Sequence, residues 1–261
     1  MKIMMCGKGG CGKSTLTVLL ARALAETGKK VLVVDADESN LCLHRLLGAR
    51  QPGIMMDAMG GRQGTREKLK QASDHLHEDD FFKQVMTFDN LPAQCMAEAD
   101  GIRLLVVGKI KEFGEGCACM IGGISRALLS RLQERDDEIV LVDAEAGLEH
   151  FGRQVDKNCD LVICIVDPNY ESLQMAGRAR QIAEGAGVQT RFILNKVDED
   201  VREAMTDGLD RERIIAAVPR NSEIFLQNLK GLPLTATVPQ LESACTFINS
   251  YRRPLSLNMK L

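Results

Sequence analysis

Residues 7 to 14 carry the clearest chemical pattern in this chain. They read Gly-Lys-Gly-Gly-Cys-Gly-Lys-Ser, the Walker A form in which lysine and a hydroxyl residue follow the second glycine. Lys13 would neutralise the β- and γ-phosphates of a nucleoside triphosphate, and the Ser14 hydroxyl would hold Mg²⁺. The residues expected around ATP or ADP in this loop are Gly7, Lys8, Gly9, Gly10, Cys11, Gly12, Lys13, Ser14 and Thr15.

The flanking sequence gives this loop the context that a phosphate site needs. Residues 2–6 are short and apolar like a buried strand, and residues 15–26 have the apolar spacing and alanine content of a helix. Glycines then let backbone N–H groups curl around phosphate oxygens at the positive end of the helix dipole. A chance glycine-rich turn is the alternative, and the strand–loop–helix order argues against it.

Two other strand ends carry carboxylates. Asp35 and Asp37 end one hydrophobic run and are separated by one residue, so both side chains could lean toward the phosphates. Asp37 could instead cap a following helix. Residues 139–143 read Ile-Val-Leu-Val-Asp, a Walker B form, and Asp143 would hold Mg²⁺ directly or through water.

Nine cysteines, an odd number without a secretory signal, predict reduced thiols. Cys11 is interpreted as a small residue tolerated in the loop. The cysteines expected to act as small buried hydrophobic residues are Cys6, Cys42, Cys159, Cys164 and Cys245.

Cys117 and Cys119 differ from the other cysteines, because they form a Cys-x-Cys pair in a glycine-rich turn. Such a pair offers two thiolates to one soft metal ion, whereas structural zinc and iron–sulfur sites require four ligands. The chain has no second Cys-x-Cys or Cys-x₂-Cys. The same pair from a second subunit would complete a Ni²⁺ or Zn²⁺ site across a two-fold axis. Coincidence is the alternative.

Strand-like and helix-like segments alternate along the chain. Strands are expected at residues 30–35, 103–107, 138–143, 161–166, 190–195 and 214–218, with helices at 124–134, 172–184, 201–208 and 241–251. A solvated helix plus loop is expected at residues 62–80. We therefore predict one α/β P-loop NTPase domain over residues 1–261, with a mostly parallel central sheet covered by helices on both faces.

Composition narrows the classes of partner. With 45% hydrophobic and 26% charged residues the chain is globular. A net charge of −3 argues against a nucleic-acid partner. No apolar run reaches the length of a membrane span and no signal peptide is recognisable, so we expect a cytoplasmic protein without stable membrane association.

Lys8 makes the loop unusual, because an ordinary P-loop requires no charge directly after its first glycine. The form resembles the deviant Walker A of the nucleotide-switched dimers that include MinD, ParA and the nitrogenase iron protein. The resemblance implies a homodimer in which Lys8 reaches the phosphates held by the facing subunit; a solvated surface lysine is the alternative. It also implies that Lys8, Lys13 and Asp37 act in catalysis, with Asp37 orienting the attacking water at the start of switch I (residues 37–40).

The same resemblance extends to the far side of the nucleotide. It implies that Gly147 lies near the γ-phosphate in switch II and that Asn195, beside Lys196, reads the adenine edge. Pro219 and Arg220, with Asn221, would close over the base.

Over nearly its whole length the chain resembles the CooC-type ATPases that assist nickel insertion into carbon monoxide dehydrogenase. The segments that carry this resemblance are residues 7–14, 117–119, 146–150, 167–169, 195–197 and 218–221. It implies a Mg²⁺-dependent ATPase with an intersubunit Ni/Zn site at Cys117 and Cys119 and a nickel enzyme as client. Glu38 and Cys11 depart from the usual pattern. The alternatives are a MinD/ParA-like regulatory ATPase and an iron–sulfur carrier ATPase.

Overall fold

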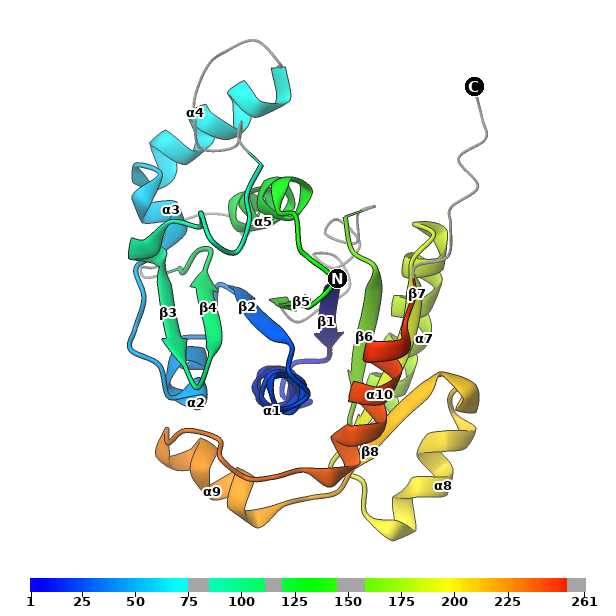
Figure 1. The fold of residues 1–261 in the computed structure, drawn as a ribbon. Helices are drawn as coiled ribbons and strands as arrows, with labels where there is room; N and C mark the ends of the chain where they lie inside the picture. Colours follow the sequence, from blue (N-terminus) through cyan, green and yellow to red (C-terminus); the bar gives the residue numbers. More distant parts are fainter. Residues whose placement is uncertain (75–84, 111–118, 145–157, 253–261) are drawn as a thin grey trace.

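A twisted sheet runs through the centre of the molecule. The computed structural model describes residues 1–74, 85–110, 119–144 and 158–252. In these ranges the strand order is β3-β4-β2-β5-β1-β6-β7-β8 (Figure 1). The strands are β1 (Lys2–Gly7), β2 (Lys30–Ala36), β3 (Met96–Ala99), β4 (Ile102–Val106), β5 (Glu138–Ala144), β6 (Leu161–Val166), β7 (Gln189–Asn195) and β8 (Ile214–Val218).

All neighbouring pairs are parallel except β3 with β4. The predicted mostly parallel α/β sheet is therefore confirmed. The antiparallel edge strand β3 was not predicted, because four residues with one charge give too short a pattern.

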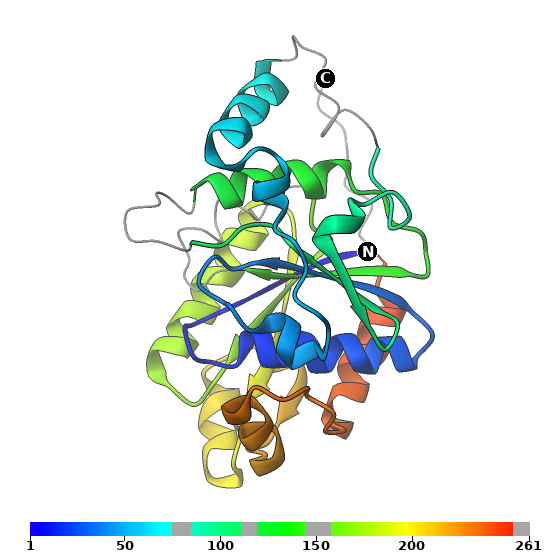
Figure 2. The same ribbon diagram turned by 90° about the vertical axis from the view of Figure 1, so that its left-hand side faces the viewer.

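Helices cover both faces of the sheet, as Figure 2 shows with α5 on one side and α1 on the other. On one face pack α1 (Lys13–Glu26), α2 (Leu43–Leu47) and α10 (Glu242–Ser250). On the other pack α3 (Met55–Ala58), α5 (Cys119–Arg131), α7 (Tyr170–Gly185) and α8 (Glu199–Asp207). Along β1, Ile3 and Met5 enter the first core, whereas Met4 and Cys6 enter the second. This two-sided burial explains why the central strands are continuous apolar runs.

Two further helices lie outside these layers. The segment expected as a solvated helix plus loop contains α4 (Gly61–Asp74), and its residues 75–80 fall outside the described ranges. α9 (Ser222–Lys230) was not predicted and has no buried residue. None of the described helices is long and apolar enough to cross a membrane.

Cys42 corrects one expectation. Four of the five cysteines interpreted as small hydrophobic residues are buried, but Cys42 is exposed. Helix α2 begins only at Leu43, so Cys42 is its N-cap residue in the loop that follows switch I. There its N–H donates to the Asn40 side-chain oxygen at 3.0 Å, and its thiol stays outside the core.

The parallel register aligns the strand ends that matter for chemistry. Asp35 of β2 lies opposite Asp143 of β5, and Asp143 in turn lies opposite Met5 of β1. The loop after β1, switch I and the end of Walker B therefore meet at one edge of the sheet. Ligands of open α/β sheets bind at this carboxyl edge.

Candidate nucleotide site

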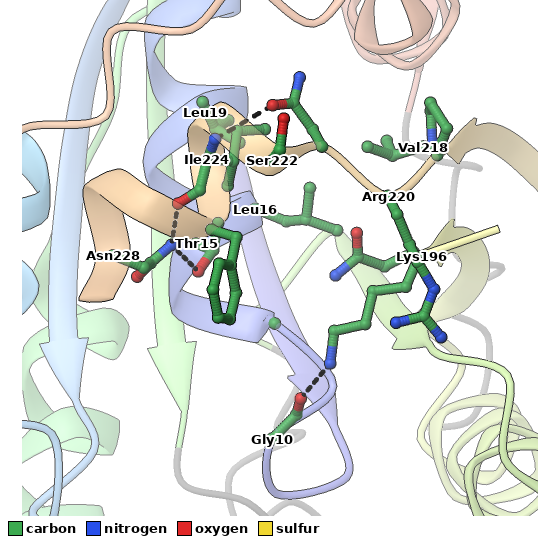
Figure 3. Close-up of a pocket in the computed structure, with 15 residues that line it drawn as sticks. Gly10, Thr15, Leu16, Leu19, Lys196, Val218, Arg220, Ser222, Ile224 and Asn228 are labelled. Carbon is green, nitrogen blue, oxygen red and sulfur yellow. Dashed lines mark hydrogen bonds between the residues drawn. The ribbon is translucent and has the colours of Figure 1, made fainter. Parts of the chain in front are cut away.

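The loop between β1 and α1 is held from the side by the end of β7. The Asn195 amide nitrogen donates to the Cys11 carbonyl at 2.8 Å, and Lys196 Nζ donates to the Gly10 carbonyl at 2.7 Å (Figure 3). Gly12 has φ 98°, and a Cβ there would run into the Asn195 amide. Glycine is thus required at this close approach. These contacts fix the shape of the loop, which presents the N-terminus of α1 to an anion.

Lys13 is a buried cation at the centre of the phosphate end. Only 7% of it is exposed, and its Nζ lies 3.5 Å from Asp37 Oδ2. Burial alone lowers the pKa of Lys13, but attraction by Asp143 and Asp37 outweighs it and raises the pKa above its ordinary value. Lys13 is therefore charged, and its present partners are carboxylates that phosphate oxygens could replace.

Ser14 and Asp143, the two residues predicted to hold Mg²⁺, are in direct contact. The Ser14 hydroxyl donates to Asp143 Oδ2 at 2.6 Å, and the Asn40 amide donates to Ser14 Oγ at 2.9 Å. Burial raises the pKa of Asp143 against the pull of Lys13 and Ser14. Adjacent hydroxyl and carboxylate oxygens suit Mg²⁺, which binds through one or two protein oxygens plus phosphates. The residues present therefore fit this ion.

Asp37 is held as an ionised acceptor. The backbone N–H and the hydroxyl of Ser39 donate to Asp37 Oδ1 at 2.9 and 2.6 Å. Burial tends to raise the pKa of Asp37, but these hydrogen bonds and the charge of Lys13 lower it overall. The contact with Ser39 is a local turn, and the next helix begins only at Leu43. The helix-capping alternative for Asp37 is thus wrong.

A second buried lysine, Lys109, lies beneath switch I and was missed from the sequence. Its Nζ lies 2.7 Å from Asp35 Oδ2 and donates to the Asp37 carbonyl at 2.5 Å. Burial raises the pKa of Asp35 to about 7 despite this partner. The Asp35 carboxylate, expected to lean toward the phosphates, is instead paired with Lys109. A lysine three residues after the end of a buried strand was the signal available.

A cavity of about 610 Å³ opens beside the loop, where a base would follow the phosphates. Its apolar wall comes from Leu16 and Leu19 of α1, Val218 of β8 and Ile224 of α9 (Figure 3). The remaining lining residues are Gly10, Gly12, Thr15, Asn195, Lys196, Pro219, Arg220, Asn221, Ser222, Phe225 and Asn228. A mostly apolar pocket with a few polar groups is typical of small-molecule sites.

The chain matches the family described as CobQ/CobB/MinD/ParA nucleotide binding domain over residues 2–234. It belongs to this family. An ATP-binding protein of Methanocaldococcus jannaschii is 43% identical over 242 residues, which are 93% of this chain and 97% of the relative. The carbon monoxide dehydrogenase accessory protein CooC of Rhodospirillum rubrum is 32% identical over 235 residues, which are 89% of this chain and 88% of CooC.

Solved structures of the family agree with the fold. The septum site-determining protein MinD of Pyrococcus horikoshii, complexed with Mg-ADP, superposes with a TM-score of 0.65 at 19% identity and covers 95% of both chains. At that identity the likeness shows the fold alone. The family model matched over residues 2–234, and not this superposition, establishes the P-loop ATP-binding domain expected from the sequence as a member of the MinD/ParA family.

In this MinD/ParA-type site the base cavity is partly formed by a helix that the sequence did not predict. The Asn228 amide of α9 donates to Thr15 Oγ1 of α1 at 3.2 Å (Figure 3). Asn221 caps α9 by accepting from the N–H groups of Glu223 and Ile224. An Asn directly before a polar residue and an apolar run was the signal for this N-cap.

All the residues expected near the base line the cavity, and their roles stay predictions. They are Asn195, Lys196, Pro219, Arg220 and Asn221. The nitrogen of Asn195 is already bound to the loop, so its amide oxygen is the atom that could accept from a base. Pro219 lines the cavity. Arg220 also lines it, but its guanidinium pairs with Asp198 at 2.7 Å.

Lys8 lies at the outer side of the loop. Its Nζ lies 2.9 Å from Glu171 at the start of α7, with 26% of the Lys8 side chain exposed. The hydrogen bond to Glu171 raises the pKa of Lys8. The family's extra lysine is therefore charged and engaged within its own chain in this structure.

The remaining predicted residues lie outside the described ranges or at the end of one. Cys117 and Gly147 lie outside the described residues. Cys119 is the first residue of α5. Within the described ranges no group of three or more His, Cys, Asp and Glu side chains could hold a metal ion. The expected Ni/Zn site at Cys117 and Cys119 stays a prediction.

Proposed function

We propose that this chain is an ATP-hydrolysing, nucleotide-switched homodimer that binds nickel or zinc between its subunits and assists nickel insertion into carbon monoxide dehydrogenase or a related nickel enzyme. One observation carries the proposal. A Cys-x-Cys pair, Cys117 and Cys119, occurs in a chain 32% identical to a carbon monoxide dehydrogenase accessory protein over 89% of its length. The family membership and the phosphate end of the site support the ATPase part.

Bound Mg·ATP would supply the phosphoanhydride bond that hydrolysis breaks. Lys13 would exchange Asp37 for phosphate oxygens, since both are anionic acceptors for the same ammonium. Ser14 and Asp143 would hold Mg²⁺ between their oxygens. Asp37, ionised and released by Lys13, would then orient the attacking water, while Ser39 keeps its other oxygen in place.

Replacement of the switch I aspartate tests this assignment. Asp37→Ala should bind ATP and ADP with affinity within a few-fold of wild type and lose turnover. Hydrolysis is measured by phosphate release and binding by calorimetry. Asp136→Ala, an exposed acid away from the site, is the control and should hydrolyse ATP normally. Equal turnover by wild type and Asp37→Ala would remove Asp37 from the mechanism.

Lys8 gives the proposal its dimeric part. To reach the phosphates of a facing subunit it must leave Glu171, and a triphosphate offers more charge than a diphosphate in return. ATP should therefore stabilise the dimer more than ADP does. Light scattering with a non-hydrolysable ATP analogue should show a reduced dimer fraction for Lys8→Ala. Lys30→Ala, paired with Asp137 where β2 begins, should behave like wild type. An unchanged dimer fraction for Lys8→Ala would mean that Lys8 does not act in trans.

Metal content tests the cysteine pair. The protein should bind one Ni²⁺ or Zn²⁺ per two chains, with affinity that falls as pH drops because the ligands are thiolates. Cys117→Ala/Cys119→Ala should lose the metal and keep ATP binding, whereas Cys42→Ala should keep both. One ion per chain, or full binding by the double variant, would contradict the intersubunit site. Iron with sulfide would indicate an iron–sulfur carrier, and no metal a regulatory MinD/ParA-type ATPase.

A further inference from the structure

Lys109 is a buried charge that the chemistry described so far does not use. Only 8% of it is exposed, and its ammonium lies between the Asp35 carboxylate at 2.7 Å and the Asp37 carbonyl at 2.5 Å. Burying a charged lysine is costly. If Lys109 served only to balance the charge of Asp35, that role would explain just one of its two contacts. The second contact is to the backbone of switch I.

The chain around Lys109 is joined to the end of β2 and to switch I at three points. The N–H of Val107 donates to the Asp35 carbonyl at 3.0 Å, and the N–H of Ile110 donates to the Glu38 carbonyl at 3.3 Å. The Lys109 ammonium bonds the Asp37 carbonyl between them. Residues 107–110 thus continue the β4–β2 pairing beyond the sheet, and Lys109 supplies the bond at the residue proposed to orient water.

Two lysines therefore contact Asp37, and a bound nucleotide should affect these two contacts differently. Lys13 holds the carboxylate at 3.5 Å and belongs to the Walker A motif, so phosphate oxygens would draw it away. Lys109, which follows the neighbouring parallel strand β4, donates to the Asp37 carbonyl. Its partners are protein atoms, and it does not line the base cavity. Of the two contacts, we therefore expect only the one made by Lys109 to persist when ATP is bound.

We propose that Lys109 is a positioning residue for hydrolysis, which fixes the backbone of Asp37 so that its carboxylate keeps its place when Lys13 turns to the phosphates. The proposal rests on the proposed function, since it takes Asp37 to orient the attacking water. A displacement of about 1 Å in such a group can cost on the order of 100-fold in rate. Lys109 should therefore act on kcat and leave nucleotide affinity nearly unchanged.

Two variants separate positioning from charge balance. Lys109→Met has a side chain of similar length without charge, but it leaves Asp35 buried and unpaired. Lys109→Met/Asp35→Asn also removes that charge, and the Asn oxygen can still accept the Asp37 N–H that bonds Asp35 Oδ1 at 3.3 Å. We expect kcat to fall about tenfold or more in both variants, with KM within about threefold, and Tm to recover only in the double variant.

Hydrogen exchange of the amides of residues 36–41, with a non-hydrolysable ATP analogue bound, gives a readout independent of turnover. Exchange should be faster in both variants than in wild type. Wild-type kcat in the double variant would show that Lys109 only balances Asp35, and unchanged exchange would also overturn the proposal. A wild-type protein without turnover would contradict the proposed function instead, and exchange would still decide the role of Lys109.

Discussion

At the phosphate end of the site five charged side chains are buried together, whereas at the base end the cavity is lined mainly by apolar and amide groups. The charged group comprises Lys13, Asp35, Asp37, Lys109 and Asp143, all at most 8% exposed. At the base end α9 has no buried residue, and Phe225 is 66% exposed. The phosphate end is thus buried and ionic, whereas the base end is an exposed, mainly apolar cavity.

This difference assigns different tasks to the two ends. The charges at the phosphate end bond one another, so a ligand there must exchange partners and thereby change the protein. The base cavity needs no such exchange. The base is the same in ADP and ATP, so its contacts with the cavity should be the same for both nucleotides. A contact of equal strength in both states adds affinity but cannot shift a conformational equilibrium. Switching should thus depend on the phosphate end alone.

The largest effect should come from Lys13→Ala. The variant leaves Asp37 and Asp143 without their shared counter-ion and gives the phosphates no ammonium, so ADP and ATP affinity should fall about 100-fold or more. Calorimetry measures this loss. A melting curve without nucleotide is the control for folding. A loss of less than about tenfold would mean that the ionic end contributes little to binding.

Gly12→Ala should have the next largest effect, and Gly10→Ala is its matched control. Both glycines have positive φ, so alanine costs about 1–2 kcal/mol at either position. At Gly10 a Cβ meets nothing within 4 Å, whereas at Gly12 it would displace the Asn195 amide. Loss of that hydrogen bond should weaken ADP binding about tenfold beyond Gly10→Ala. Equal affinities would show that the Asn195 contact does not shape the loop.

A smaller effect is expected from Phe225→Ala, which removes an aromatic wall of the base cavity. ATP and ADP affinity should both fall about 5- to 10-fold, in equal measure, and kcat should hold. Leu229→Ala is the control, because Leu229 is 71% exposed on the same helix and does not line the cavity. A change in the ratio of ATP to ADP affinity would contradict the claim that only the phosphate end distinguishes the two nucleotides.

The last prediction concerns the chemical labelling of two thiols in the unsubstituted protein, where we expect the smallest effect. Burial raises the pKa of Cys11 to about 12, so its thiol stays protonated at pH 8 and should resist alkylation. Cys42 is exposed in the loop after switch I and should react. Peptide mass spectrometry after brief iodoacetamide treatment measures both. Labelling of Cys11 at the rate of Cys42 would mean that the phosphate end opens readily.

Local patterns were enough to predict most of this architecture. The glycine-rich loop and the strands that end at Asp143 and Asn195 have strong local signals, because burial on both faces leaves continuous apolar runs. Lys109 could not be assigned in this way, since its partners lie on a strand that is distant in sequence. Helix α9 was not predicted because most of its apolar residues are exposed, and β3 because it is short. Tertiary packing thus accounts for the miss at Lys109, whereas α9 and β3 lack a strong local pattern.

The position of β1 in the sheet has a consequence for biosynthesis. This first strand pairs only with β5 and β6, which begin at Glu138 and Leu161. At about 5–20 residues per second, the ribosome needs roughly ten seconds or more to supply these neighbours. Throughout that interval the glycine loop has no strand on either side of it. Until then ATP cannot guide the folding of this loop, and a nascent chain that ends before β6 must keep the apolar strand β1 from pairing elsewhere.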